Sequence, residues 1–477
     1  MIRKTFNKIP IGVKAAIVYI LGSLFSRGLS MITMPIFTRI MTTAEIGTVS
    51  IYNSWYSILS VIATLSLTSG GFQSAMKDFP QERDQYESSV LTLTSCMAII
   101  LSVVYFINPQ FWNSIFDLNT PLMVLMLISF MLVPAQDFWL LRQRYEFKYK
   151  SVGLISFCNA FIGTISAIIV VLLLNEQGSD CVVEGRLIAT KSIILVVSLA
   201  LWIKIMTRGK VFYSERFWKY SLAISLPLVG NSLSGQLLNV SDRIMIGKLV
   251  NESAVGIYST LTTVSSIFTI VWTAINSSFV PYLFQNLEKD SRKLKQISIS
   301  LMAAYGVIAV AVTFMAPEII RILATEEYYE AIYIMPPIAA GIFLISVSNM
   351  YSNILIYHKK TKYIMLASIS AAIVNICTNY IFIPIFGYMA AAYTTLASYI
   401  ILATVQAFFA KRVHKKITGH KEIYYDRFVF LLGVCIVLIT LTGLFFYKTL
   451  VLRYLVILFG GIIGGIVLIK NIKTMRE

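Results

Sequence analysis

Long apolar runs separated by short polar stretches dominate this chain of 477 residues. None of the runs alternates apolar and polar positions, as the roughly 10-residue strands of a membrane barrel do. A helix of about 20 residues crosses roughly 30 Å of hydrocarbon, and the runs reach this length. The pattern predicts fourteen membrane-spanning helices, at residues 13–36, 46–70, 89–107, 121–141, 152–174, 185–204, 219–247, 254–284, 297–317, 331–357, 363–383, 387–410, 428–447 and 451–469.

An internal repeat organises these spans. The segment Gly22–Asn53 is similar to Asn231–Thr260, at an offset of 209 positions. Six spans fit within each period, and about 59 residues remain for two further helices. Because six is even, both halves enter the membrane in the same direction, which makes the repeat a parallel one. We therefore expect an all-α membrane protein with two pseudo-symmetric six-helix lobes and two additional C-terminal helices, at 1–210, 211–415 and 416–477.

Composition agrees with this class. Hydrophobic residues make up 57% of the chain and charged residues 13%, whereas soluble domains are about a quarter charged. This composition excludes a soluble enzyme. The chain carries no Walker loop, so we expect no ATP hydrolysis on it. The five cysteines and three histidines show no spacing typical of disulfides or metal ligands, and we interpret the histidines as solvated residues of basic loops.

The net charge is +17, and the positions of the Lys and Arg residues indicate the membrane topology. With a cytoplasmic N-terminus, inner loops and tails hold 31 Lys and Arg, outer loops hold six including Arg453, and spans hold three. This asymmetry is the positive-inside rule, and it predicts both termini in the cytoplasm rather than a nucleic-acid surface.

Polar groups inside spans are costly and need an explanation. In the first span Ser23, Arg27 and Ser30 share one helical face. The corresponding face of the seventh span holds Ser232, Gln236 and Asn239, continues to Arg243 one turn on, and is flanked by Asn231 and Asp242. Lipid cannot satisfy these groups, so both faces should point into the protein or toward water. Serine and amide side chains often only join helices, whereas a mid-span cation such as Arg27 favours a cavity.

Three further ionisable residues lie inside spans. Lys191 is close enough to the outer end of span six to extend toward the interface. Asp137 could pair with Arg142 or Arg144 and is the better candidate for a coupling ion. For Asp242, which is next to Arg243, the sequence allows either a structural role or a substrate-facing one. The predicted substrate-binding residues are Ser23, Arg27, Ser30, Lys191, Asn231, Gln236, Asn239 and Arg243, and the coupling-ion candidates are Asp137 and Asp242.

Three stretches resemble a known family. LLNVSDRIMIGKLVNESAVGIYS is similar to the seventh-helix signature of bacterial polysaccharide transporters, the O-antigen type of lipid-linked oligosaccharide flippase. PIFTRIMTTAEIGTVSIYNS resembles their first two helices, and NYIFIPIFGYMAAAYTTLASYI their eleventh–twelfth hairpin. The family lies in the multidrug/oligosaccharidyl-lipid/polysaccharide exporter superfamily. The resemblance covers essentially the whole chain but does not separate one sugar from another.

The resemblance implies a fold like that of multidrug exporters, with the lobes forming a V around a cationic cavity. It implies a substrate of undecaprenyl-pyrophosphate-linked oligosaccharide, flipped from the inner to the outer leaflet of the bacterial cytoplasmic membrane by alternating access. Arg27 and Arg243 match cationic or polar positions of that cavity, although Thr33 and Met34 are uncharged where lipid II flippases carry more charge. No cofactor is implied beyond a coupling proton or sodium ion. Expected partners are membrane lipids and the polymerase and chain-length machinery of the same pathway.

Two other functions stay open. A cation-coupled multidrug exporter of the same superfamily would carry a buried acid in one lobe and about twelve spans. A membrane-embedded polysaccharide polymerase would need catalytic groups on large outer loops. The chain offers only an acidic group before the tenth span, which we interpret as a solvated loop, at Glu318, Glu326, Glu327 and Glu330.

Overall fold

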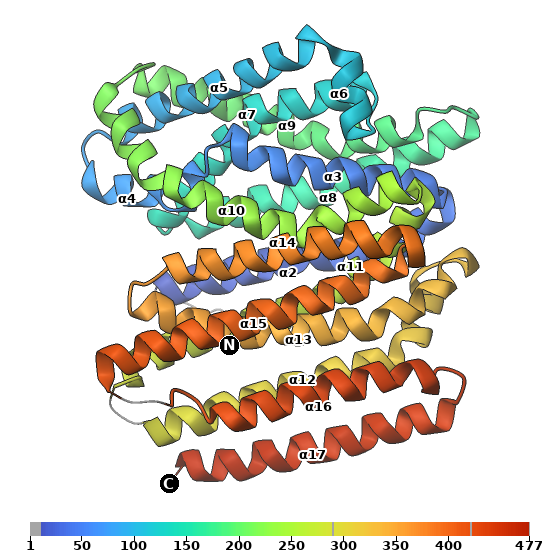
Figure 1. The fold of residues 1–477 in the computed structure, drawn as a ribbon. Coiled ribbons are helices and arrows are strands. Elements are labelled where there is room, and N and C mark those ends of the chain that lie inside the picture. Colours follow the sequence, from blue (N-terminus) through green and yellow to red (C-terminus); the bar gives the residue numbers. More distant parts are fainter. Residues whose placement is uncertain (1–10, 289–290, 420–421, 477) are drawn as a thin grey trace, which may run out of the picture. The chain divides into compact units, whose positions relative to one another are not determined.

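The computed structural model describes residues 11–288, 291–419 and 422–476, and throughout this part of the chain the secondary structure is helical (Figure 1). Ser23 and Arg27 belong to α2, but their side chains lie outside the described set. The elements of the N-terminal half are α2 (Ile11–Ile40), α3 (Thr43–Ala63), η1 (Leu67–Ser69), α4 (Gly71–Asp78), α5 (Arg83–Ile107), α6 (Pro109–Phe116), α7 (Thr120–Tyr145), α8 (Tyr149–Glu176), α9 (Val182–Gly209) and α10 (Glu215–Leu249). Those of the C-terminal half are α11 (Glu252–Asn286), α12 (Ser291–Leu323), η2 (Glu326–Ile334), α13 (Met335–Tyr357), α14 (Lys362–Phe386), α15 (Met389–Thr418), α16 (Asp426–Phe446) and α17 (Leu450–Arg476).

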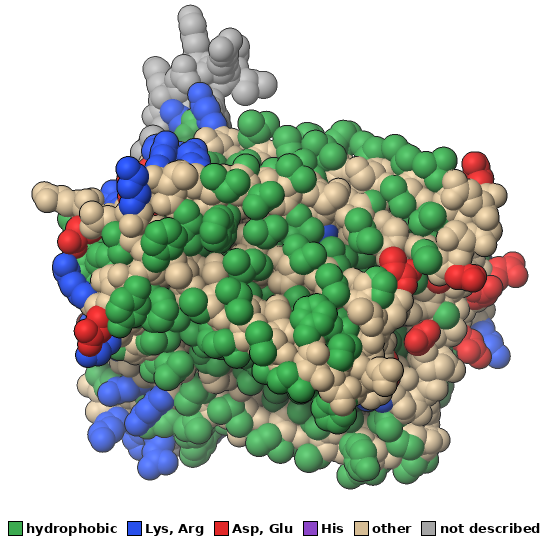
Figure 2. Space-filling model, turned by 90° about the horizontal axis from the view of Figure 1, so that it is seen from above, with side chains coloured by type: hydrophobic (Ala, Val, Ile, Leu, Met, Phe, Trp, Pro, Cys, Tyr) green, Lys and Arg blue, Asp and Glu red, His purple; other side chains and the backbone are tan. Residues whose placement is uncertain are grey.

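Each predicted span coincides with one long helix. Among the described residues, ten helices are long and apolar enough to cross a membrane by length and composition. On the face shown in Figure 2, hydrophobic side chains form a broad band, most of the Lys and Arg lie at one end, and most of the Asp and Glu lie at the other. The all-α, multi-pass fold is therefore confirmed, and it reflects the need to satisfy every backbone hydrogen bond within lipid.

The second span is shorter than predicted. The apolar run 46–70 is helical only to Ala63, where Thr64 caps α3 and the backbone reverses through Leu65 and Ser66, at φ of 48° and 51°. Apolar content continues through the turn, so hydropathy alone does not show the end of the helix. The short elements η1 and α4 then return the chain to α5.

Contacts divide the chain into two compact units, residues 1–236 and 237–477. The division lies inside the continuous helix α10, because its first part packs with the N-terminal helices and its last part with α11, α14 and α15. The lobe boundary expected between residues 210 and 211 stays a prediction.

The core of the first unit is aromatic. The rings of Phe72 and Phe138 stack at 4.8 Å between centroids, and those of Tyr86 and Phe217 meet edge to face at 5.4 Å. The hydroxyl of buried Tyr86 lies 2.6 Å from that of Ser221, so the first turns of α10 are joined to α5. This cluster holds α4, α5, α7, α9 and the start of α10 together.

A close helix approach in the same unit requires glycine. A Cβ added at Gly209, the last residue of α9, would lie 2.2 Å from the Asp84 carbonyl oxygen, which is backbone and cannot turn aside. We expect Gly209→Ala to lower the free energy of unfolding by about 1–3 kcal/mol, the usual cost of overpacking. Thermal unfolding of the detergent-solubilised protein measures this. Gly460→Ala is the control because no atom lies within 4 Å of its added Cβ, and equal unfolding midpoints for the two variants would contradict the prediction.

The second unit is built around α13, whose side chains are almost all buried. It packs against α11, α12, α15 and α16, and α17 packs on α12 (Figure 1). The two additional C-terminal helices are thus part of this unit. One placement from the sequence is wrong: Arg453 is not in an outer loop but in the first turn of α17, 4% exposed, because Glu318 and the Phe314 carbonyl bind it.

Candidate functional site

The polar face of α10 includes a buried acid. Asp242 is 5% exposed, and its carboxylate accepts hydrogen bonds from the Tyr258 hydroxyl at 2.5 Å and from the backbone N–H of Arg243 at 2.8 Å. Tyr258 lies on α11 and is itself buried. Charge-assisted hydrogen bonds of this kind stabilise an ionised carboxylate away from water. Asp242 therefore joins α10 to α11 within the second unit.

Arg243 is held in a defined position. One terminal nitrogen donates to the Asn239 carbonyl, the other donates to the Thr262 hydroxyl, each at 2.9 Å, and the Asp242 carboxylate lies 4.0 Å away. The side chain is 21% exposed. A guanidinium has five N–H donors, so this arrangement orients the group without using all its hydrogen-bonding capacity on the bonds described here.

The other polar residues of α10 are less enclosed. Asn231 and Gln236 are half-buried and belong to the first unit, whereas Asn239 is exposed and belongs to the second. The predicted stripe is therefore one helical face whose members fall in two units. Whether it faces α2 across a cavity stays a prediction.

A second buried polar network begins at Ser241, the residue before Asp242, and the sequence analysis missed it. The Ser241 hydroxyl donates to the Asn375 side-chain oxygen at 2.9 Å, and the Asn375 amide donates to Thr395 at 3.2 Å. Asn379 donates to the same Asn375 oxygen, and Thr394 donates to Asn379. All five side chains are buried, and they join α10, α14 and α15. Two asparagines one helical turn apart inside an apolar run were the available signal.

Lys191 lies on aromatic rings. Its ammonium nitrogen is 3.7 Å from the centroid of the Tyr56 ring and 5.4 Å from that of Tyr52, both on α3. A cation over an aromatic face is stabilised by about 0.5–2 kcal/mol, more when it is desolvated. The structure therefore gives this half-buried lysine a role in joining α9 to α3, and substrate binding by it stays a prediction.

Asp137 is not paired with Arg142, one of the two arginines that the sequence offered it. Arg142 instead binds Asp84, Glu87 and Glu146, which joins α5 to α7. The side chain of Asp137 is half-buried, with Arg144 and Tyr56 as electrostatic neighbours. Within the described residues its carboxylate makes no hydrogen bond or ion pair, which is unusual for an acid inside a span.

The polar part of α2 adjoins a small cavity. It has a volume of about 260 Å³ and is lined by Tyr19, Gly22 and Ser26 of α2, by Arg144, and by α8. The Arg144 guanidinium lies 5.5 Å from the centroid of the Tyr19 ring. Ser30 is exposed and donates to the Ser26 carbonyl of its own helix. Ser23 and Arg27 lie outside the described side chains, so their predicted roles stay predictions.

The histidines differ from their sequence interpretation. His414 is buried in α15, and its Nδ1 lies 3.1 Å from Nε2 of His358, which follows α13. Burial lowers the pKa of His358, and the charge of Glu288 opposes this. His420 lies outside the described residues. Among the described residues no group of three or more His, Cys, Asp or Glu side chains could hold a metal ion.

Two family models match this chain. A model of the family described as "Polysaccharide biosynthesis protein" matches residues 13–287, and one described as "MatE" matches residues 227–381. The chain is 22% identical over 382 residues to "Lsg locus putative protein 1" of Haemophilus influenzae, covering 76% of this chain and 90% of that protein.

Two solved structures share the fold. The lipid II flippase MurJ in an inward closed conformation matches with a TM-score of 0.66 and 16% identity, covering 91% of this chain and 100% of that one. An inward-facing multidrug resistance MATE family transporter of the MOP superfamily matches with a TM-score of 0.61 and 15% identity, covering 82% and 96%.

Proposed function

The chain belongs to the polysaccharide biosynthesis protein family, and on this premise we propose that it flips an undecaprenyl-pyrophosphate-linked oligosaccharide from the inner to the outer leaflet. The membership and the MATE-like fold confirm the resemblance seen in the sequence. The family match over residues 13–287 carries the proposal, because it includes both α2 and α10, the helices that begin the two repeats.

The chemistry of the substrate explains the cations on these helices. An isolated buried charge costs tens of kcal/mol by Born estimates, so a pyrophosphate needs a compensating cation to cross hydrocarbon. Arginine meets phosphate oxygens with two parallel hydrogen bonds. In the proposal Arg27 and Arg243 bind the pyrophosphate, and the anchoring of Arg243 by Asn239 and Thr262 supports this by fixing the direction of its guanidinium.

We propose proton or sodium coupling through Asp137 in preference to Asp242. A half-buried carboxylate that makes no described hydrogen bond or ion pair gains most from binding a cation, whereas Asp242 already accepts from Tyr258. Asp137→Asn should slow flipping about tenfold, which lies within the 5- to 150-fold effects that typical coupling free energies produce. It should also make flipping independent of the ion gradient. Flipping in proteoliposomes under imposed proton or sodium gradients measures this.

Asp180→Asn is the matched control, since Asp180 is exposed between α8 and α9. An Asp137→Asn protein that flips at the wild-type rate with unchanged ion dependence would exclude this residue from coupling.

The membrane potential should also drive turnover. An inside-negative potential favours outward movement of an anion by about 2.3 kcal/mol per charge per 100 mV. Collapsing the potential with valinomycin and equal potassium on both sides should therefore slow flipping at least severalfold. An unchanged rate would remove the potential from the mechanism.

The proposal as a whole is tested with purified protein in proteoliposomes that contain a fluorescent lipid-linked oligosaccharide. Flipping exposes the label to a membrane-impermeant quencher, and we expect this only when the protein is present. Transport of cationic dyes without lipid flipping would support the multidrug-exporter alternative, which the "MatE" match keeps in view. Elongation of the glycan by the protein alone would support the polymerase alternative.

The topology and partners belong to the same proposal. We place the protein in the bacterial cytoplasmic membrane with both termini in the cytoplasm, which the distribution of Lys and Arg supports. A polymerase and chain-length machinery would then receive the flipped lipid-linked unit on the outer side.

A further inference from the structure

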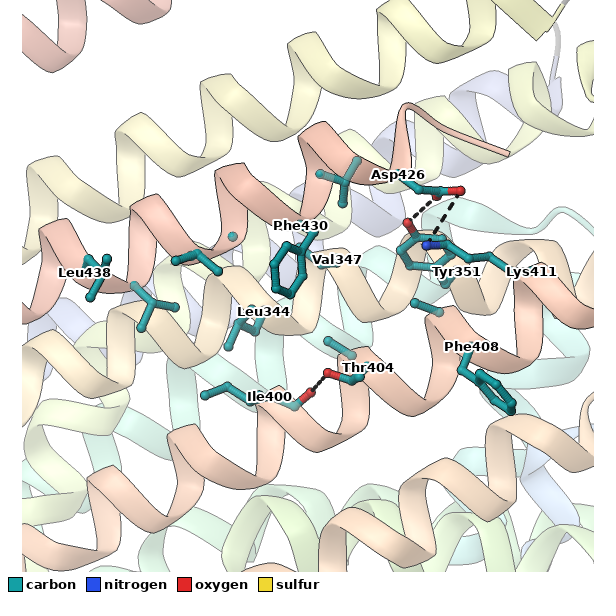
Figure 3. Close-up of a pocket in the computed structure, with 16 residues that line it drawn as sticks. Leu344, Val347, Tyr351, Ile400, Thr404, Phe408, Lys411, Asp426, Phe430 and Leu438 are labelled. Atoms are coloured by element: carbon teal, nitrogen blue, oxygen red, sulfur yellow. Dashed lines mark hydrogen bonds and ion pairs between the residues drawn. The ribbon is translucent and has the colours of Figure 1, made fainter. Parts of the chain in front are cut away.

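A long groove in the second unit is independent of the residues assigned so far. It runs between α13, α15 and α16, has a volume of about 430 Å³, and is lined mainly by aliphatic and aromatic side chains (Figure 3). Its volume lies in the range of ligand pockets, about 300–1,000 Å³. Phe408 and Phe430 at its edges are 56% and 70% exposed, so the groove opens at the side of the unit.

Small residues leave the groove empty of protein. Ala403 and Ala407 of α15 and Gly433 of α16 are among the residues that line it. A Cβ added at Gly433 would meet only Leu344, at 4.0 Å. The single hydroxyl on this stretch of α15, that of Thr404, donates to the Ile400 carbonyl of its own helix, so it does not make the surface polar. The groove therefore suits an unbranched apolar chain.

One end of the groove is charged. Asp426 accepts a hydrogen bond from the Tyr351 hydroxyl at 2.6 Å, and the Lys411 ammonium lies 3.6 Å from its carboxylate (Figure 3). Lys411 is 39% exposed. Lys415 follows one turn later on the same face of α15, and Arg427 follows Asp426, both exposed. The three cations at this end outnumber its two acids, Asp426 and the neighbouring Glu422. The positive-inside rule predicts that this end faces the cytoplasm.

We propose that the groove binds one acyl chain of an anionic phospholipid, with the phosphate at Lys411, Lys415 and Arg427. The apolar lining suits the acyl chain, the cations match the headgroup, and the cytoplasmic leaflet is the one whose anionic lipids attract basic segments. This site is separate from the proposed substrate path and does not depend on it. The lipid would brace α16 against α13 and α15, where protein atoms leave space.

The acyl half of the site is tested by filling the groove. Gly433→Leu places an apolar side chain where the acyl chain would lie, and the open space around Gly433 allows it to fold. Native mass spectrometry of the detergent-purified protein with added phosphatidylglycerol should show at least fivefold less retained lipid than wild type. Gly461→Leu is the matched control, because its added Cβ meets nothing within 4 Å on α17, and it should retain the wild-type amount.

The headgroup half is tested with exposed residues whose replacement does not disturb packing. Lys415→Gln and Arg427→Gln should each weaken phosphatidylglycerol retention about fivefold, which corresponds to about 1 kcal/mol per basic residue. Retention of phosphatidylcholine with the same acyl chains should be unchanged by either substitution. Arg321→Gln, an exposed arginine of α12, is the charge control.

Three results would overturn the proposal. The first is wild-type retention of phosphatidylglycerol by Gly433→Leu. The second is equal retention of phosphatidylglycerol and phosphatidylcholine by the wild-type protein. The third is displacement of phosphatidylglycerol by equimolar undecaprenyl phosphate, which would identify the occupant as an isoprenoid tail instead. Since none of these measures flipping, their failure is distinguishable from failure of the proposed function.

Discussion

Replacing Arg27 with alanine is expected to block surface polysaccharide while the lipid-linked precursor accumulates on the inner leaflet. Removing one partner of a desolvated charge pair costs about 2–5 kcal/mol, which corresponds to a loss of flipping of about 30-fold or more. Arg27→Lys should keep partial function, because it retains the charge and loses the planar fork that binds two phosphate oxygens. The measurements are surface glycan on intact cells and the leaflet distribution of the precursor.

Arg39→Ala is the matched control on the same helix. Arg39 lies in the last turn of α2, and its guanidinium donates to the Pro35 carbonyl, so it is held at the end of the span rather than within it. We expect near-normal export from this variant. Normal export from Arg27→Ala cells with comparable protein in the membrane would remove Arg27 from the mechanism.

Replacing Arg453 with methionine should be the most destabilising of the single substitutions considered. Arg453 is 4% exposed and binds the Glu318 carboxylate at 2.7 Å and the Phe314 carbonyl at 3.1 Å. Breaking a buried pair costs about 3–5 kcal/mol because it leaves an uncompensated charge, and the partial exposure of Glu318 places the expected loss near the lower end. Methionine keeps most of the side-chain volume, so the effect reports the charge. The midpoint of thermal unfolding in detergent measures it.

The double variant Arg453→Met/Glu318→Gln separates the effect of the lost charge on stability from the effect of altered packing. Adding Glu318→Gln to Arg453→Met should recover part of the lost stability, because no carboxylate is then left without its cation. Arg321→Met, at an exposed position of α12, should leave the unfolding midpoint unchanged. If Arg453→Met unfolds at the wild-type temperature, the ion pair does not hold α17 on α12.

The groove involves α16 and the Arg453 pair involves α17, the two C-terminal helices. α16 packs on α12 and α13, and α17 packs on α12, so both lie on the outside of the second unit. Arg453 joins α17 to the unit with charge at one position, whereas the proposed lipid fills the space along α16. Loss of either should therefore loosen these helices without changing the residues of α2 and α10 proposed for transport.

The places of the long helices were predictable because hydrophobic length is a property of local sequence. Each predicted run became one helix, and the longest stretch wrongly predicted as helical, at the end of 46–70, lies where the chain turns at Leu65 and Ser66 while still apolar. The ionisable residues inside spans were equally visible, because an acid or base within an apolar run needs no structure to be noticed.

The partners of those residues were not predictable, since they depend on which helices pack together. From the sequence, Arg142 could have formed an ion pair with Asp137. Because α5 packs on α7, Arg142 forms ion pairs with Asp84 and Glu87 instead. The network of Ser241, Asn375 and Thr395 likewise forms only because α10, α14 and α15 meet.

By itself, the sequence determined that this is a multi-pass helical membrane protein of two related halves, because hydropathy, repeat and charge asymmetry are properties of the chain alone. Only the tertiary structure decided that Asp242 binds Tyr258, that Lys191 lies on tyrosine rings, that Arg453 is buried, and that α13, α15 and α16 leave a groove. Each of these requires atoms from different helices to come within a few ångströms of one another. Spacing along one helix says which side chains share a face, and the neighbouring helix decides what that face meets.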